Sequence, residues 1–202
     1  MAYQVPAMTI HFMLQTLQES SGAHYEKLLT DAGLTRFLRK LPPENWEPVA
    51  EQTELTRLFT AVYHTLGESL TRTFLRNWGQ FTGNKFAANP WVADLRAEAQ
   101  ALPPAAQLAW FVQTMATLSA RSWAPHILSE DAQAWYCEMD PCPVCRDIRG
   151  AHGPICGDCE GMYSAMAKHL LGRRVVIAEV ACAAAGAARC KWAYYKEEAS
   201  HV

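Results

Sequence analysis

The cysteines of this sequence are the residues best suited to chemistry, and all seven lie within residues 137–190. Cys142 and Cys145 form one Cys-x-x-Cys pair. Cys156 and Cys159 form a second pair, after ten intervening residues. Such a turn brings two thiolates to one ion, and zinc takes four ligands in a tetrahedron. Spacing alone therefore predicts a zinc site of four thiolates at these two pairs, although their separation is shorter than in the usual zinc ribbon.

A second group of donors lies in the segment EVACAAAGAARC, where Glu179, Cys182 and Cys190 interrupt a run of alanines. On an uninterrupted strand Glu179 and Cys182 would point to opposite faces, because their separation is odd. They converge only if the strand ends or bulges between them, and Cys190 then faces Cys182 across a hairpin. A buried carboxylate beside thiolates is costly unless a cation lies among them. This segment therefore predicts an alternative zinc site of mixed oxygen and sulfur ligands, which needs one further thiolate from elsewhere.

Amphipathic helices are predicted in the first two thirds of the chain. Apolar residues recur at helical spacing in residues 10–17 and, as one long stripe with Gly67 as its weak point, in residues 51–77. Residues 101–120 begin with prolines suited to a helix start and continue with an apolar face. These segments supply the helical part of the expected fold.

The pattern changes in the last third of the chain. Residues 126–139 are aromatic and alternating, as in paired strands, and residues 156–171 have helical spacing with Gly172 as a stop. Residues 173–180 and 189–196 are typical of two strands of a closing hairpin. The fold class is therefore predicted as α+β, with N-terminal helices packed on a small antiparallel sheet.

Length and composition limit the classes of protein. The 202 residues suffice for a single domain over residues 1–202, with a helical part over about 1–122 and a cysteine-rich, zinc-bearing α+β part over about 123–196. The net charge of −2 and the lack of a basic cluster exclude an electrostatic nucleic-acid interface. No apolar run approaches the ~20 residues of a membrane span, and the start lacks a secretory signal, so we expect a cytoplasmic protein. An odd number of cysteines in such a protein favours metal or thiol chemistry over a disulfide framework.

The segment GPICGDCEGMYSAMAKHLLGRRVVIAEVACAAAGAARCKW resembles the C-terminal signature of the 4-vinyl reductase domain family. That signature is a Pro-x-Cys, a helix, a strand ending in Glu-x-x-Cys, a glycine, and a last Cys before a strand. The family includes the J protein of bacteriochlorophyll synthesis and the sensor domains of phenol- and xylene-responsive activators. The resemblance implies a fold like that of TRAPP vesicle-tethering subunits and of nitric-oxide-signalling domains.

The resemblance also implies a ligand set for one zinc ion, namely Cys156, Glu179, Cys182 and Cys190. Four protein ligands leave no open position for water, so this zinc would be structural. The additional Cys142, Cys145 and Cys159 lie outside the shared set, and a second metal or a rearranged site stays open as an alternative. Cys137 has no expected role.

The functional expectation is a zinc-containing protein that binds a hydrophobic small molecule, as a carrier, helper or sensor for an aromatic or tetrapyrrole ligand of the bacteriochlorophyll pathway. The resemblance places Trp135 in a pocket between helices and sheet, and Phe111 and Met115 are further candidates, with core packing as the alternative for all three. No phosphate loop or dinucleotide fingerprint appears, so we expect a binding protein rather than an enzyme. A vinyl reductase and a TRAPP-type adaptor are the alternatives, and we expect a homodimer.

Overall fold

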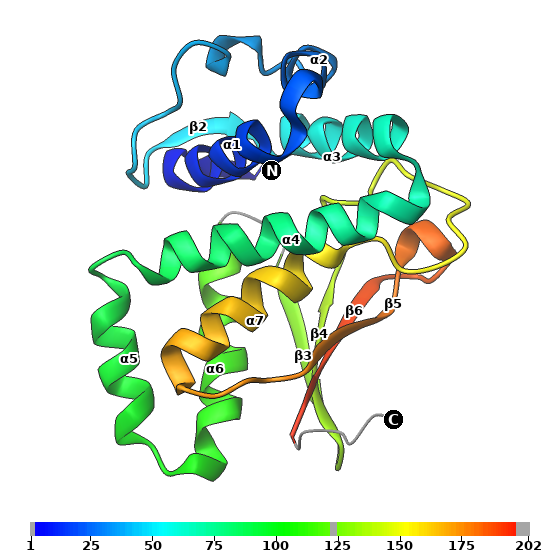
Figure 1. Cartoon of the computed structure of the whole chain (residues 1–202). Coiled ribbons are helices and arrows are strands. Elements are labelled where there is room, and N and C mark those ends of the chain that lie inside the picture. The colour runs from blue at the N-terminus through cyan, green and yellow to red at the C-terminus, as the bar shows by residue number, and fades with distance from the viewer. Residues whose placement is uncertain (1–2, 122–124, 197–202) are drawn as a thin grey trace.

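The computed structural model describes residues 3–121 and 125–196 (Figure 1). Helices come first and a small antiparallel sheet follows, which confirms the predicted α+β class. The expected boundary between the helical and the cysteine-rich parts, at residues 122–123, falls outside the described residues. Within the described residues, no helix is both long and apolar enough to cross a membrane.

The first layer lies above the rest of the molecule in Figure 1 and contains the predicted N-terminal helix, α1 (Ala7–Ser21). Strand β1 (Gln4–Pro6) pairs antiparallel with β2 (Pro48–Glu51), a two-stranded ribbon that the sequence did not indicate. Three short helical elements lie between α1 and β2 along the chain: η1 (Gly22–His24), α2 (Tyr25–Asp31) and η2 (Thr35–Phe37). This layer contributes α1 and the segment before β2 to the cavity described below.

The predicted long helix over residues 51–77 is wrong, because the chain breaks at Gly67 into α3 (Gln52–Leu66) and α4 (Glu68–Ala87). Gly67 has φ +73°, a left-handed conformation that glycine adopts without steric cost. Because of this break, the apolar residues after Gly67 do not continue the helix face formed by the apolar residues before it. Leu70, which the stripe placed toward the core, is 61% exposed.

The second half of the molecule surrounds α7 (Gly157–Leu171), which runs beneath α4 in Figure 1. The four-stranded sheet has the order β3-β4-β6-β5 with every pair antiparallel, and the predicted strand pairs and closing hairpin are present. The remaining elements are β3 (His126–Glu130), β4 (Ala134–Met139), β5 (Ile177–Ala181), η3 (Ala183–Ala185), β6 (Cys190–Tyr195), α5 (Val92–Ala101) and α6 (Pro104–Ser119). Helices α6 and α7 both contact this sheet.

Helices α4 and α7 form the most extensive contact of the fold, and glycines allow it. A Cβ at Gly79 of α4 would lie 1.9 Å from the carbonyl oxygen of Asp158, and one at Gly161 of α7 would lie 1.9 Å from that of Arg76. Gly83 and Gly157 are similarly close to the opposite backbone. The two helix backbones therefore touch directly, and this contact fixes the N-terminus of α7, where both candidate sites meet.

Candidate metal centre and ligand cavity

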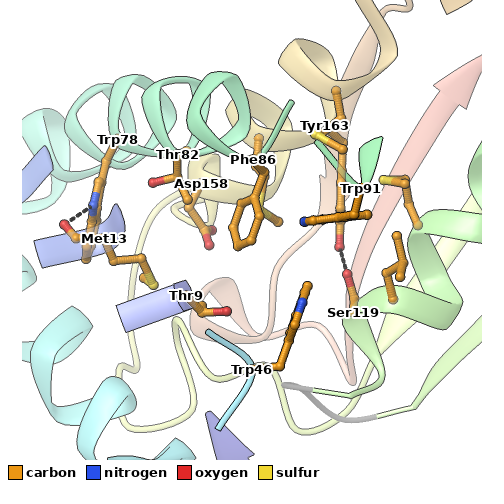
Figure 2. A pocket seen from close by; sticks show the side chains of 15 residues that line it. Thr9, Met13, Trp46, Trp78, Thr82, Phe86, Trp91, Ser119, Asp158 and Tyr163 are labelled. Carbon is orange, nitrogen blue, oxygen red and sulfur yellow. Dashed lines mark hydrogen bonds between the residues drawn. The ribbon is translucent and has the colours of Figure 1, made fainter. Parts of the chain in front are cut away.

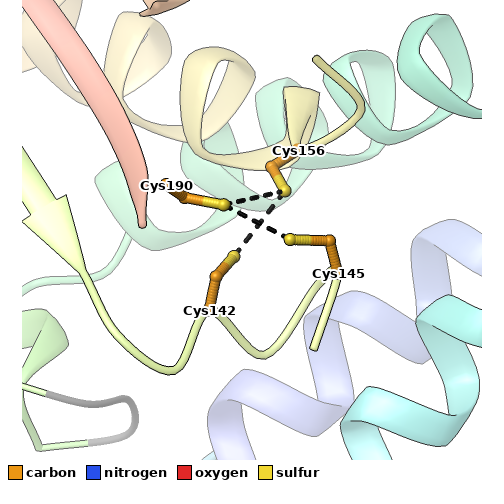
Figure 3. Close-up of side chains that lie close together, drawn as sticks. All are labelled: Cys142, Cys145, Cys156 and Cys190. Atoms are coloured by element: carbon orange, nitrogen blue, oxygen red, sulfur yellow. Dashed lines mark hydrogen bonds between the residues drawn. The ribbon is translucent and has the colours of Figure 1, made fainter. Parts of the chain in front are cut away.

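Four thiols from three segments converge beside the N-terminus of α7 (Figure 3). Cys142 and Cys145 come from the loop after β4, Cys156 precedes α7 and Cys190 begins β6. The Sγ atoms of Cys145 and Cys190 are 3.3 Å apart, and the Cys156 Sγ lies 3.6 Å from that of Cys142 and 3.8 Å from that of Cys190. Zinc bonds of ~2.3 Å place the sulfurs of a tetrahedral site about 3.8 Å apart. The four thiols therefore have the spacing of a tetrahedral metal site.

A second group of donors shares two of these thiols. The ligand atoms of Cys156, Glu179, Cys182 and Cys190 all lie within 4.8 Å of one another, and the Sγ atoms of Cys156 and Cys182 are 3.9 Å apart. The pairing of β5 with β6 shifts register between Glu179 and Ala181, and β5 ends at Ala181. This irregularity turns Glu179 and Cys182 to the same site, as the odd spacing required.

The donors are buried, and burial makes their charged forms costly. Glu179 is 4% exposed, while Cys156 and Cys190 are fully buried. Burial away from water raises the pKa of Glu179 to about 9, an effect to which the neighbouring Cys182 thiolate adds, and burial also raises the pKa of the Cys156 thiol well above its usual range. Glu179 has no ion pair within the described residues. A cation among these donors would offset the cost, because metal coordination keeps thiolates and carboxylates ionised.

Hydrogen bonds from neighbouring groups orient the donors. The Glu179 Oε2 accepts the backbone N–H of Cys156 at 2.8 Å, while its Oε1 is buried and has no hydrogen-bond partner within the described residues. The Glu179 N–H donates to the Glu160 carboxylate at 2.7 Å, which is also paired with Arg72 of α4 at 3.0 Å. The N–H of Ala183 lies 3.3 Å from the Cys190 sulfur. Such outer contacts hold ligating side chains in place, and they leave Glu179 Oε1 as the carboxylate oxygen without a hydrogen-bond partner among the described residues.

A cavity of about 80 Å³ lies among α1, α4, α6 and α7 and the segment before β2 (Figure 2). Three aromatic rings meet there: the ring of Trp46 stacks on Phe86 with centroids 6.4 Å apart and meets Trp91 edge-on at 5.7 Å. Figure 2 shows these rings and the side chain of Asp158 converging from different elements on one space. The remaining lining is largely apolar and includes four methionines, namely Met13, Met115, Met162 and Met166.

Three buried polar atoms of this cavity have no hydrogen-bond partner within the described residues. They are the Oδ1 of Asp158, the Oγ1 of Thr82 and the Nε1 of Trp91. Burial raises the pKa of Asp158 to about 7. An unsatisfied buried polar group costs about 1–3 kcal/mol, so three of them around one cavity indicate a space that a polar ligand or water fills. Other polar groups there are satisfied, since the Trp78 N–H donates to the Met13 carbonyl and Ser119 bonds to Tyr163.

The residues that the sequence predicted as ligand or metal contacts lie partly at the cavity or the metal donor groups and partly elsewhere. Met115 lines the cavity, whereas Phe111 and Trp135 do not. Phe111 is fully buried with its ring against Tyr194, and Trp135 is half-buried on β4 opposite Tyr194 of β6. Cys159, the fourth thiol of the spacing-based set, belongs to neither donor group within the described residues. Sequence reasoning missed Asp158, because a single acidic residue after Cys156 carries no signal of its own.

Comparisons with solved structures support the fold, and a comparison with family models supports the resemblance of the C-terminal segment. The chain is similar to an H-NOX protein from S. oneidensis in the Fe(II)NO ligation state, with 13% identity over 96% of this chain and 100% of that one and a TM-score of 0.54. A protein studied for the modulation of heme redox potential through protein-induced porphyrin distortion has 14% identity over 95% of this chain and 99% of that one, with a TM-score of 0.53. The phenol-responsive sensory domain of the transcription activator PoxR with phenol has 17% identity, 86% and 90% coverage, and a TM-score of 0.49.

The search among curated proteins gave no match. The model of the 4-vinyl reductase domain family matches residues 135–193, a segment that holds all six donors of the cysteine cluster. The resemblance of this segment to the 4-vinyl reductase domain family is thereby confirmed.

Proposed function

We propose that this chain is a small-molecule-binding module, a sensor or carrier in which a structural zinc centre holds the fold and the cavity receives the ligand without converting it. The observation that carries the proposal is the aromatic cavity with three buried polar atoms that lack partners within the described residues. Binding sites are typically apolar spaces with a few convergent polar groups that fix the orientation of the ligand. The match to the 4-vinyl reductase domain and the ligand-binding proteins that share the fold support this function.

The cavity favours a ligand of one aromatic ring with a hydroxyl group. The cavity of about 80 Å³ is roughly half of the ~150 Å³ that holds a benzene ring in an engineered protein cavity, so a single ring is the largest ligand that it favours, and the flexible methionines of its lining must move to admit one. The Trp91 N–H donates only and needs an acceptor, whereas the Asp158 carboxylate needs a donor. A hydroxyl offers both, while an ammonium group offers donors alone. Edge and face contacts with the rings of Trp46 and Phe86 suit a planar ligand.

A tetrapyrrole of the bacteriochlorophyll pathway, which the family resemblance implies, is the second candidate ligand. A protein of similar fold has been studied for its heme, which is a tetrapyrrole, and this likeness supports a tetrapyrrole ligand. It requires α1 and α7 to move apart, because the cavity is far smaller than such a macrocycle. An adaptor of the TRAPP-subunit type would need a filled core instead, and the cavity favours ligand binding over that alternative.

In this proposal the zinc centre stabilises the fold. Its donors join the loop after β4, the start of α7 and both strands of the β5–β6 hairpin. Metal bound across four separate segments contributes its binding free energy to folding. It also holds Asp158, two residues after Cys156, at the wall of the cavity.

Calorimetric titration of the metal-loaded chain with phenol tests the proposal, with toluene and benzylamine as comparators. We expect phenol to bind more tightly than both, because only its hydroxyl both donates and accepts. Trp91→Phe removes one N–H and should weaken phenol binding about three- to tenfold. Trp135→Phe is the matched control outside the cavity and should leave the affinity unchanged. A loss of binding in Trp135→Phe alone would instead place the ligand at Trp135 and Phe111, and binding of a tetrapyrrole but not of phenol would contradict the single-ring ligand.

A further inference from the structure

The two donor groups of the cysteine cluster share one edge. Cys156 and Cys190 belong to both groups, Cys142 and Cys145 belong only to the first, and Glu179 and Cys182 belong only to the second. The shared Sγ atoms of Cys156 and Cys190 are 3.8 Å apart. That is the edge length of a zinc–sulfur tetrahedron, about 3.8 Å for bonds of ~2.3 Å. The six donors therefore have the arrangement of two tetrahedra joined along the Cys156–Cys190 edge.

A single four-coordinate ion leaves two of the six donors without a role. An ion in the first group leaves the buried Glu179 Oε1 without a partner among the described residues, beside the Cys182 thiol. An ion in the second group leaves Cys142 and Cys145 uncoordinated, although their sulfurs lie 3.6 Å and 3.3 Å from those of Cys156 and Cys190. A single ion therefore leaves two donor side chains of the cluster uncoordinated, whereas two divalent ions engage all six donors.

We propose that the cluster is a binuclear zinc centre in which the thiolates of Cys156 and Cys190 each bridge two ions. Cys142 and Cys145 complete the tetrahedron of one ion, and Glu179 and Cys182 complete that of the other. A thiolate sulfur keeps lone pairs after it binds one ion and can coordinate a second, and zinc accepts both thiolate and carboxylate ligands. The inference does not depend on which ligand occupies the cavity.

The bridged centre explains why the Cys142–Cys145 loop packs onto this site. The loop is tied to its surroundings by the Ala151 N–H, which donates to the Ala184 carbonyl at 3.1 Å. The carboxylate of Glu68 in α4 accepts the N–H groups of His152 and Gly153 at 2.7 Å and 3.1 Å. These contacts tie the loop both to α4 and to the turn of the β5–β6 hairpin, and they keep its two thiols beside Cys156 and Cys190.

The metal content of the full chain tests the proposal directly. The chain is purified after growth with added zinc, and zinc and protein are quantified by native mass spectrometry and elemental analysis. We expect two zinc ions per chain. After exchange with ¹¹³Cd, the NMR spectrum should contain two resonances, each split by coupling to the other through the shared sulfurs. One metal per chain, two uncoupled cadmium resonances, or iron with acid-labile sulfide would each overturn the binuclear centre.

Single substitutions then separate the two tetrahedra. Cys142→Ser and Cys182→Ser should each retain one zinc ion, because each removes a terminal ligand of one ion only. Cys137→Ala is the matched control, since Cys137 is buried on β4 outside both groups, and it should retain two. Cys159→Ser should also retain two, and a loss of zinc there would favour the four-thiolate site of the two Cys-x-x-Cys pairs. If a ligand variant fails to fold, the cadmium spectrum of the unaltered chain still decides the question.

Discussion

Replacement of Gly161 by alanine tests the contact that positions both candidate sites. The added Cβ would lie 1.9 Å from the carbonyl oxygen of Arg76 and 2.6 Å from the backbone nitrogen of Gln80. Both atoms belong to the backbone of α4, so no side-chain rotation can relieve the overlap. The helices must separate by about 1 Å or more, which also displaces the N-terminus of α7 that carries Cys156 and Asp158.

Two opposing effects decide the magnitude for Gly161→Ala. Alanine in a helix interior favours folding by up to about 1 kcal/mol relative to glycine. Overpacking of a tight contact typically costs about 1–3 kcal/mol, and a clash between backbones belongs at the upper end of that range or beyond it. We expect a net loss of about 2 kcal/mol in the free energy of unfolding, which lowers the melting temperature by about 4–8 °C for a chain of this size.

Thermal unfolding followed by circular dichroism measures this loss, with Gly153→Ala as the matched control. Gly153 lies in the loop before α7, and a Cβ there meets no atom within 4 Å. The control should melt within about 2 °C of the unaltered chain, since surface substitutions rarely change stability by more than about 0.5 kcal/mol. A Gly161→Ala variant as stable as the control would refute the close contact between α4 and α7.

Three further predictions concern the two sites. Asp158→Asn should weaken phenol binding about tenfold in calorimetry above the Asp158 pKa of about 7, because a charge-assisted hydrogen bond becomes a neutral one. Unchanged affinity would remove Asp158 from the site. Cys182→Ser should lower the melting temperature more than Cys137→Ala does in parallel scans, because it removes a metal ligand as well as a buried thiol, and equal shifts would argue against a structural metal. Acidification should release zinc to a colorimetric indicator, because protons compete with the metal for the thiolate and carboxylate ligands, and no release is expected at neutral pH. Retention of all zinc at about pH 4 would contradict the assigned donors, since these must lose their protons to bind the metal.

The C-terminal part was the more predictable from sequence because its signals are local. The alternation of residues 126–139 predicted the β3–β4 pair, and the strand-like segments 173–180 and 189–196 predicted the hairpin of β5 and β6. The odd spacing of Glu179 and Cys182 required an irregular strand, and the register shift before Ala181 provides it. Spacing and strand geometry thus grouped Glu179, Cys182 and Cys190, whereas Cys156 joined them only through the family resemblance, and Cys159, which spacing alone included, belongs to neither donor group among the described residues.

The cavity could not be predicted in the same way, because its lining comes from distant parts of the chain. Trp46, Trp91 and Asp158 meet only after α1, α4, α6 and α7 have packed together. Each of these residues is unremarkable in its own segment, and the resemblance directed attention to Trp135 instead. The Gly67 break was missed for a related reason, since an apolar stripe reports periodicity but not a left-handed residue within it.

A crystal structure of the zinc-loaded chain grown with phenol tests the central claim most directly. We predict ring density in the cavity beside Trp46 and Phe86, with the phenol oxygen within hydrogen-bonding distance of the Asp158 carboxylate. An unfilled cavity, or ring density against Trp135 and Phe111 instead, would contradict the account.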